Sequence, residues 1–250
     1  MNLTQNNGPL VLAPVRPAFL RRRPKETRSV PFQTPGEEIA NAVIHGIGAL
    51  LGIAGLVLLT RRSLSRDGLT AVYVIFASAM VLMFLASTLY HAMVPGRAKR
   101  IFRIFDHQAI YLFIAGTYTP FCLLGLKGPW GWSLFGLEWG LALTGMVLYA
   151  AGWGFIKRAE LAIHILMGWA VLAGSVPLFR ALPLKSLILL LAGGFAYTAG
   201  TFWYRAGSGK QTINEIVPRI VRGRRGAHVV WHVFVLAGAL CHFFSVWSLV

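Results

Sequence analysis

Residues 69–94 read LTAVYVIFASAMVLMFLASTLYHAMV and contain no Asp, Glu, Lys or Arg. A helix that crosses about 30 Å of hydrocarbon needs on the order of 20 consecutive apolar residues, so this stretch is long enough to span a membrane. It ends in Ser87-Thr-Leu-Tyr-His91, which places a hydroxyl group and an imidazole at one end of the expected span. The same stretch therefore predicts both a transmembrane helix and a polar site at its end.

Six further apolar stretches of this kind are separated by short polar segments. With the first, the expected spans cover residues 39–60, 69–94, 104–126, 130–155, 161–179, 186–204 and 229–250. The composition agrees, because 56% hydrophobic and 13% charged residues do not suit a water-facing domain. The stretches are longer than the strands of a membrane β-barrel and lack their alternation. We expect an all-α fold, a bundle of seven transmembrane helices.

The basic residues predict how this bundle is inserted. Most of the 24 Lys and Arg residues lie in the N-terminal tail and in the second, fourth and sixth loops. The positive-inside rule then places the N-terminus in the cytoplasm and the C-terminus outside. The net charge of +16 is therefore attributed to loops beside anionic lipid headgroups, and we expect membrane lipids but no nucleic acid as partners. The expected location is a bacterial plasma membrane.

The chain divides by composition into a tail and one membrane domain. Residues 1–35 are rich in Pro, Arg and Asn and have no apolar periodicity, which is typical of a disordered tail. Residues 36–250 form the expected seven-helix domain. Its cysteines, Cys122 and Cys241, both lie inside expected spans, where we interpret them as small buried apolar side chains rather than a disulfide.

Ionisable residues inside spans are costly, and several of them share one side of the membrane. The second span ends at His91, the third begins near Asp106 and the seventh begins at His228. Because successive helices alternate in direction, these three ends face the same side. The distribution of basic residues makes that side cytoplasmic.

The spacing of the histidines indicates a metal centre. His228 and His232 are four residues apart and so lie on one helix face, an arrangement with which two imidazoles can hold one metal ion. Val229, Val230 and Trp231 separate them, so the glutamate of the zinc peptidase motif is missing. His91 can add a third nitrogen and leave the fourth tetrahedral position open, as in catalytic zinc sites. Three imidazoles favour zinc over magnesium or calcium.

Two further side chains are candidates for catalysis. Asp106 is the expected carboxylate beside the metal, and Ser87 precedes His91 by four residues and shares its helix face. Each has a structural alternative: Asp106 can pair with Arg103, and the Ser87 hydroxyl can serve in helix packing. A single histidine at a helix end can likewise be a surface or hydrogen-bonded residue, so the metal centre is inferred only from the three histidines together.

Glu38, Asn41 and His45 are spaced three and four residues apart and form one polar stripe at the same end of the first span. We interpret them as second-shell groups that support the metal ligands, with helix capping as the alternative for Glu38. His242 is ten residues beyond His232, about 15 Å away along a helix, so we expect a buried hydrogen-bonding residue there. His107, His164 and Glu138 receive no assignment.

Four motifs together resemble the hemolysin III family, which is grouped with the progestin and adipoQ receptors and, more distantly, the alkaline ceramidases. They are Glu38 to His45-Gly46, Ser87-Thr-Leu-Tyr-His91, Phe105-Asp106-His107 and His228-Val-Val-Trp-His232. The resemblance covers residues 36–248. It implies a seven-helix bundle, a zinc ion held by His91, His228 and His232, and a water molecule contacted by Asp106, with Ser87 nearby.

Three classes of function are compatible with this site. The preferred hypothesis is zinc-assisted hydrolysis of a lipid amide or ester, a reaction type suggested by the ceramidases, with Asp106 as proton acceptor and Ser87 orienting water or the developing oxyanion. The second is a receptor or regulator in which zinc only braces the helices. The third is a cytolytic pore, which the collection of polar residues at one membrane end disfavours. The sequence leaves the oligomeric state open.

Overall fold

The computed structural model describes residues 33–64, 69–207 and 225–249. Within these ranges all regular structure is helical, which confirms the all-α prediction. The helices are α1 Pro35–Ser63, α2 Thr70–Ala92, α3 Arg97–Pro120, α4 Gly128–Ala150, α5 Gly154–Trp169, α6 Ser175–Ala181, α7 Leu184–Gly207 and α8 Ala227–Trp247, with a π-helical turn η2 at Phe121–Leu126 and a 3-10 turn η3 at Ala170–Gly174. Nearly all of the tail expected at residues 1–35 lies outside the described residues.

Seven helical segments are long and apolar enough to cross a membrane, as expected. The third consists of α3 with η2, and the fifth of α5, η3 and α6. The largest difference is at α3, which begins at Arg97 although the apolar stretch begins only at Ile104. The basic residues between these positions belong to the helix: the exposed Arg97 and Arg100 can keep their charges in the interface, whereas Lys99 is buried. Asp106 is therefore more than two turns inside α3 rather than at its start.

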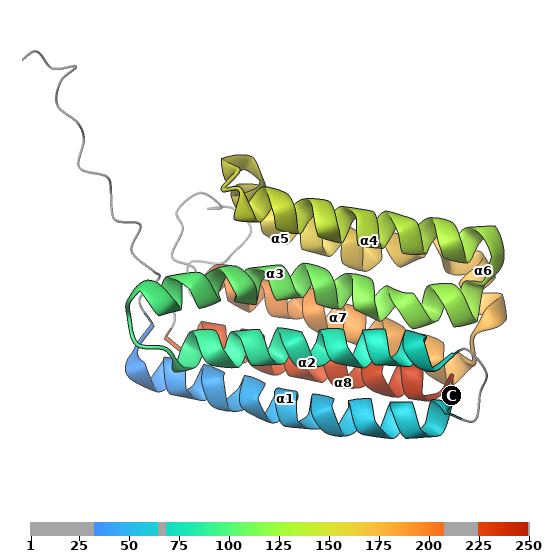
Figure 1. Ribbon diagram of the computed structural model, residues 1–250, viewed down its shortest axis with the longest axis horizontal. Helices are drawn as coiled ribbons and strands as arrows, with labels where there is room; N and C mark the ends of the chain where they lie inside the picture. The colour runs from blue at the N-terminus through green and yellow to red at the C-terminus, as the bar shows by residue number, and fades with distance from the viewer. Residues whose placement is uncertain (1–32, 65–68, 208–224, 250) are drawn as a thin grey trace, which may run out of the picture. The chain divides into compact units, whose positions relative to one another are not determined.

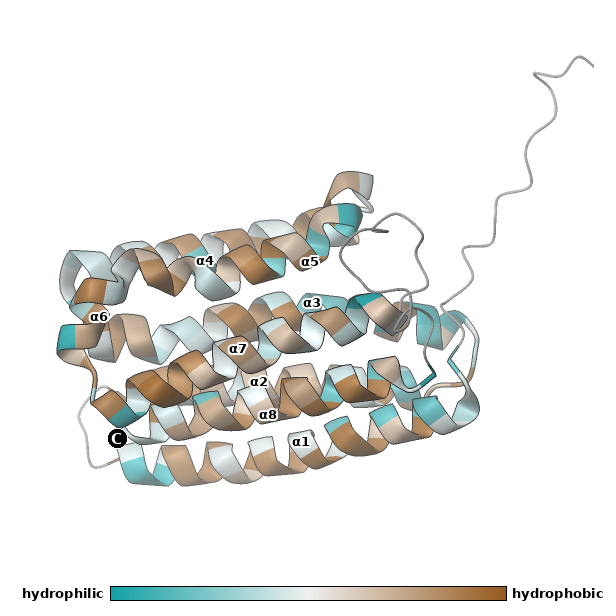
Figure 2. Ribbon diagram, turned by 180° about the vertical axis from the view of Figure 1, so that it is seen from behind, coloured by the Kyte–Doolittle hydropathy of each residue, from teal (hydrophilic) through white to brown (hydrophobic). Residues whose placement is uncertain are grey.

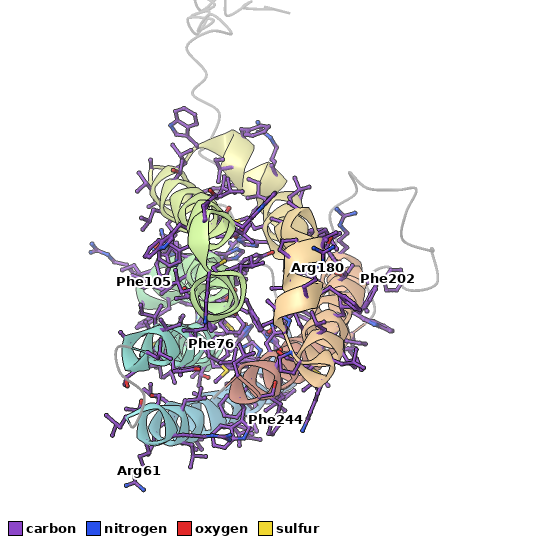
Figure 3. All side chains as sticks on the ribbon, turned by 90° about the vertical axis from the view of Figure 1, so that its right-hand side faces the viewer. Arg61, Phe76, Phe105, Arg180, Phe202 and Phe244 are labelled. Carbon is purple, nitrogen blue, oxygen red and sulfur yellow. The ribbon has the colours of Figure 1, made fainter. Side chains whose placement is uncertain are left out.

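The helices form two groups that are in contact (Figure 1). One consists of α1, α2, α3, α7 and α8, and the other of α4 and α5. Helix α2 packs between α1 and α3, and α7 packs against α8. Helix α8 also contacts α1, so the first and last helices of the bundle are neighbours. Helices α4 and α5 lie on the side of α3 that is remote from α1 and α2. The view along the helices shows α7 and α8 beside this stack (Figure 3).

Many large apolar side chains point outward from the bundle. Leu50 of α1, Val147 of α4 and Leu166 of α5 are 70%, 66% and 72% exposed. Hydrophobic residues cover the middle of the helices, whereas hydrophilic ones gather toward the helix ends (Figure 2). Water would solvate such a surface poorly, but lipid tails solvate it well. This chain is therefore an integral membrane protein.

The interior depends on small residues where helices approach closely. Gly193 of α7 faces His242 of α8, whose Nε2 lies 3.1 Å from the carbonyl oxygen of Leu190. His242 is thus the buried hydrogen-bonding residue expected from the sequence. Cys122 and Cys241 are both free thiols, which confirms that they form no disulfide.

We expect Gly193→Ala to weaken the contact between α7 and α8. The added Cβ would overlap the imidazole of His242 and lie 3.0 Å from the carbonyl oxygen of Gly238, so helix backbones must separate. Overpacking of this kind costs about 1–3 kcal/mol of the free energy of unfolding. Thermal denaturation in lipid tests it, with Gly194→Ala as the matched control, because the Cβ there meets Trp169 only at 3.8 Å. Equal melting points for the two variants would contradict the prediction.

Candidate metal centre

The three predicted ligands meet at one end of the bundle. His91 lies in the last turn of α2, and His228 and His232 lie in the first two turns of α8. One ring nitrogen of each histidine lies within 4.8 Å of the other two. Residues far apart in the chain therefore converge as the alternation of helix directions required.

The distances between these nitrogens fit one bound ion. The Nε2 atoms of His91 and His232 are 3.1 Å apart, and their rings are inclined at 86°. Two nitrogens that each lie 2.0–2.1 Å from a tetrahedral zinc ion are roughly 3.3 Å from one another. The ring of His228 is 4.6 Å from that of His232 between centroids, which leaves it close enough to supply the third nitrogen. The donor set thus suits zinc in type, and the spacing of its His91–His232 pair matches a tetrahedral site.

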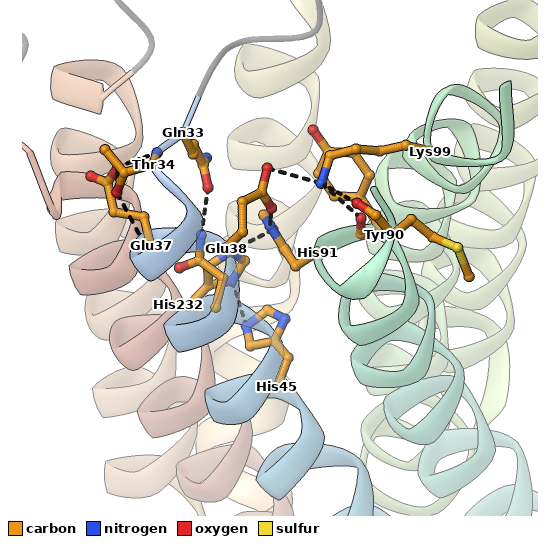
Figure 4. A network of polar contacts seen from close by, with 11 residues as sticks. Gln33, Thr34, Glu37, Glu38, His45, Tyr90, His91, Lys99 and His232 are labelled. Carbon is orange, nitrogen blue, oxygen red and sulfur yellow. Dashed lines mark hydrogen bonds and ion pairs between the residues drawn. The ribbon is translucent and has the colours of Figure 1, made fainter. Parts of the chain in front are cut away.

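The second nitrogen of His91 binds a carboxylate (Figure 4). His91 Nδ1 donates to Oε2 of Glu38 over 2.7 Å, while Oε1 of Glu38 accepts from Nζ of Lys99 over 2.8 Å. Lys99 is buried and also donates to the carbonyl oxygens of Tyr90 and Met93. A carboxylate at Nδ1 places the ring proton there and leaves the Nε2 lone pair available for a metal ion.

His232 is supported in a similar way by another residue of α1. Its Nδ1 lies 2.6 Å from Nε2 of His45, a buried ring that packs edge-on against Phe84. With His232 as donor in this bond, its own Nε2 is free to bind a metal ion. Asn41 is fully buried one turn earlier, and its Nδ2 donates to Oε1 of Gln33 over 2.6 Å. Glu38 and His45 thus contact the rings of two candidate ligands, while Asn41 bonds Gln33; a supporting role for these three residues stays a prediction.

The capping of α1 involves Glu37 rather than Glu38, as the second residue of a capping box. The N-cap residue is Thr34, whose side chain accepts from the backbone N–H of Glu37, while the Glu37 carboxylate accepts from the backbone N–H of Thr34. The other oxygen of Glu37 accepts from the N–H of Gly226, the residue before α8. Glu37 therefore also positions the start of the helix that carries His228.

Sequence reasoning missed Glu37 and Lys99. The run Thr34-Pro35-Gly36-Glu37 is a capping box with proline at the first helical position, a signal that could have identified Glu37. Nothing local marks Lys99, because its role depends on where α3 lies relative to Glu38.

The two predicted catalytic residues are placed differently with respect to the histidines. Ser87 is buried one turn before His91, and its Oγ finds no hydrogen-bond partner in the described part of the chain. Asp106 is half-buried on α3 and does not belong to the group of three histidines. The alternative ion pair between Asp106 and Arg103 is not formed among the residues described. The catalytic roles of Ser87 and Asp106 stay predictions.

Glu38→Gln should weaken zinc binding by roughly 10–100-fold, the usual effect of removing a group that supports a ligand. The amide keeps the shape of the side chain but loses the charge that holds the His91 proton at Nδ1 and pairs with Lys99. Competition against a zinc-chelating dye measures the dissociation constant of the folded protein. Glu160→Gln is the matched control, because Glu160 also binds a histidine Nδ1, that of His107 at 2.9 Å, but outside this centre. Unchanged affinity in Glu38→Gln would argue against a supporting role.

Comparison with known proteins shows the family to which this chain is similar. Residues 33–243 match the model of the family described as Haemolysin-III related. Hemolysin-3 of Bacillus cereus is 37% identical over 227 residues, which cover 89% of this chain and 94% of that protein. A Hemolysin-3 homolog of Bacillus subtilis (strain 168) is 39% identical over 215 residues, 84% of this chain and 92% of that protein.

A more distant relative occurs in animals. The human Monocyte to macrophage differentiation factor is 25% identical over 218 residues, which cover 85% of this chain and 84% of that protein. This likeness fits the wider superfamily to which the sequence motifs pointed. With seven membrane-spanning helices, the matched residues 33–243 and near full-length similarity to the bacterial proteins, this chain belongs to the Haemolysin-III related family.

Proposed function

We propose that this protein is a zinc-dependent hydrolase of lipid amides or esters. The observation that carries the proposal is the group of three histidines, in which His91 and His232 are oriented by Glu38 and His45 while no fourth protein ligand completes the group within the described residues. Three protein ligands are typical of catalytic zinc sites, whereas structural sites have four. Bound zinc supplies Lewis-acid activation of a carbonyl group and of water.

The side chains around the histidines supply the remaining chemistry. Asp106 accepts the proton of the attacking water at its carboxylate, which is the role of a general base. Ser87 donates from Oγ to the carbonyl oxygen of the substrate as negative charge develops there. The buried hydroxyl of Ser87 has no partner in the described chain, which supports this assignment. A buried hydroxyl without a hydrogen bond is unfavourable unless a ligand provides the partner. The substrate enters from the bilayer, along helices whose outer faces are apolar.

The site faces the cytoplasm in this proposal. Basic residues support it, since Arg97, Lys99 and Arg100 begin α3 at the membrane end where His91 ends α2. Excess Lys and Arg mark the cytoplasmic side of membrane proteins.

The test combines metal analysis with lipid mass spectrometry. Purified protein is stripped with a chelator, half of it is reloaded with zinc, and both samples are incubated with vesicles that contain a ceramide or a phospholipid. We expect about one zinc ion per chain and release of free fatty acid by the reloaded sample alone. Zinc that binds and raises the melting temperature without any product would refute the hydrolase and favour the bracing role. Absence of zinc binding would refute both.

The name of the bacterial relatives, Hemolysin-3, favours a second candidate, a cytolytic pore. The same vesicles, loaded with a fluorescent dye, distinguish it from hydrolysis. Leakage that persists after chelation, with no fatty acid released, would support the pore. Intact vesicles during zinc-dependent product formation would exclude it.

A further inference from the structure

A second set of ionisable side chains lies outside the metal centre, between α3, α4 and α5. We call it the acid–histidine arm, and it consists of His107 and Tyr111 on α3, Glu138 on α4, and Glu160 and His164 on α5. The polar residues that received no assignment from the sequence are thus collected in one place. Their arrangement follows the length of the helices in three levels.

The first level is an ion pair near the membrane end that carries the metal centre. His107 Nδ1 lies 2.9 Å and 3.0 Å from the two carboxylate oxygens of Glu160. Tyr149 of α4 stacks on the His107 ring, with 5.4 Å between centroids. All three helices of the arm therefore contribute at this level. The side chains of His107 and Glu160 are 17% and 11% exposed, so the pair is accessible from the surface at this end of the bundle.

The second level is one turn deeper. Tyr111 follows His107 by four residues and His164 follows Glu160 by four, so each lies on the same helix face as its predecessor. The two rings meet at 4.1 Å between centroids. Both the hydroxyl of Tyr111 and Nε2 of His164 are buried without a partner in the described part of the chain. Gly145 of α4 provides the room, because a Cβ there would overlap the Tyr111 ring.

The third level is a carboxyl group in the middle of the bundle. Glu138 is 0% exposed, and neither of its oxygens finds a hydrogen-bond partner among the described residues. It precedes Gly145 by seven residues, which places it about 10 Å deeper along α4. Tyr118 and Cys122 are the titratable neighbours from α3 and η2, and both interact electrostatically with Glu138. Tyr118 itself is satisfied, since its hydroxyl donates to the carbonyl oxygen of Met167 over 2.7 Å.

A packing role does not account for these groups. An unpaired carboxylate in hydrocarbon is strongly unfavourable, and an apolar side chain of the same volume would fill the space without that cost. Buried polar atoms without partners are uncommon, and here three residues on three helices have them in one arm. Series of Asp, Glu and His inside membrane proteins are typical of proton pathways, where water completes the hydrogen bonds.

We propose that the acid–histidine arm is a proton pathway, through which Glu138 exchanges one proton with water at the membrane end that carries the metal centre. A proton from water enters at the His107–Glu160 pair and reaches one ring nitrogen of His164, which releases a proton from its other nitrogen. Water molecules carry it over the roughly 10 Å to the carboxylate of Glu138, which becomes a carboxylic acid, and release follows the reverse order. Only O–H and N–H bonds form and break. The pathway is independent of lipid hydrolysis.

Infrared difference spectroscopy of the full chain in lipid tests this pathway. Lowering the pH should produce the carbonyl stretching band of a protonated carboxyl group, and the band should shift when the protein is transferred to heavy water. Glu138→Gln should eliminate the band. Glu138→Asp, which retains a carboxyl group, should move it to a different frequency, so one of the two variants identifies the band even if the other fails to fold.

A matched pair of histidine variants tests the route. His164→Asn should slow the appearance of the band after a pH jump by roughly 10²-fold, the lower end of what a positioned proton-transfer group contributes. His242→Asn should leave the rate unchanged, because His242 is also buried but lies on α8 outside the arm. A spectrum that is identical in wild type and Glu138→Gln would overturn the proposal. Equal rates in His164→Asn and wild type would also overturn it.

Discussion

His232→Ala is expected to abolish stoichiometric zinc binding. The substitution removes one of three ligands and also leaves His45 without the partner that its Nε2 contacts at 2.6 Å. The loss of affinity should therefore exceed the roughly 10–100-fold expected for a supporting residue such as Glu38. Because the metal binds only the folded chain, the rise in melting temperature that zinc gives the wild type should disappear as well.

The control is His242→Ala, a second buried histidine on the same helix. His242 lies ten residues beyond His232, about 15 Å along α8, and contacts a backbone carbonyl instead of another histidine. It should melt at a lower temperature than wild type but keep its zinc and its zinc-dependent shift. Zinc content is measured on folded, monodisperse protein by elemental mass spectrometry. One zinc ion per chain in His232→Ala would remove this residue from the ligand set.

Asp106→Asn is expected to retain zinc but to lose most of the hydrolytic activity. The amide is isosteric with the carboxylate but cannot accept the proton of water, and a positioned general base contributes typically 10²–10⁴-fold to the rate. Because Asp106 does not belong to the histidine group, zinc content and the zinc-dependent shift in melting temperature should remain at wild-type levels. The readout is the rate of fatty acid release at saturating zinc.

Arg103→Gln separates catalysis from a structural ion pair. If Asp106 served mainly to bind this arginine, removing either partner would lower stability and activity to the same extent. We expect Arg103→Gln to retain turnover, since no pair between the two side chains is formed in the described chain. Undiminished hydrolysis by Asp106→Asn would exclude Asp106 as the base.

The convergence of the three histidines could be predicted because it depends on the alternating direction of the helices and on helical spacing. Helices that alternate in direction bring the end of α2 and the start of α8 to the same membrane side, and a spacing of four residues aligns His228 with His232. Helical spacing likewise predicts that Glu38 and His45 share one face of α1. Both contact rings of candidate ligands in the structure.

Other parts could not be predicted, for identifiable reasons. The basic run that opens α3 predicts a loop, because hydropathy detects only the part of a helix that lies in hydrocarbon. Asp106 is for that reason expected at a helix start, whereas it lies nine residues after Arg97, where the helix begins. Lys99 is 61 residues from Glu38 along the chain, and Glu160 is 53 residues from His107. Pairs between different helices depend on helix rotation, which no local pattern encodes.

The sequence by itself determined that the chain crosses a membrane seven times and that three imidazoles lie at one end of the helices, because hydrocarbon thickness and helical periodicity act on each segment separately. Only the tertiary structure decided which carboxylates support those imidazoles and that a second series of acids and histidines follows α3, α4 and α5. The physical reason is that such contacts arise from the packing of whole helix faces. In lipid, small residues such as Gly145 and Gly193 control how closely those faces approach.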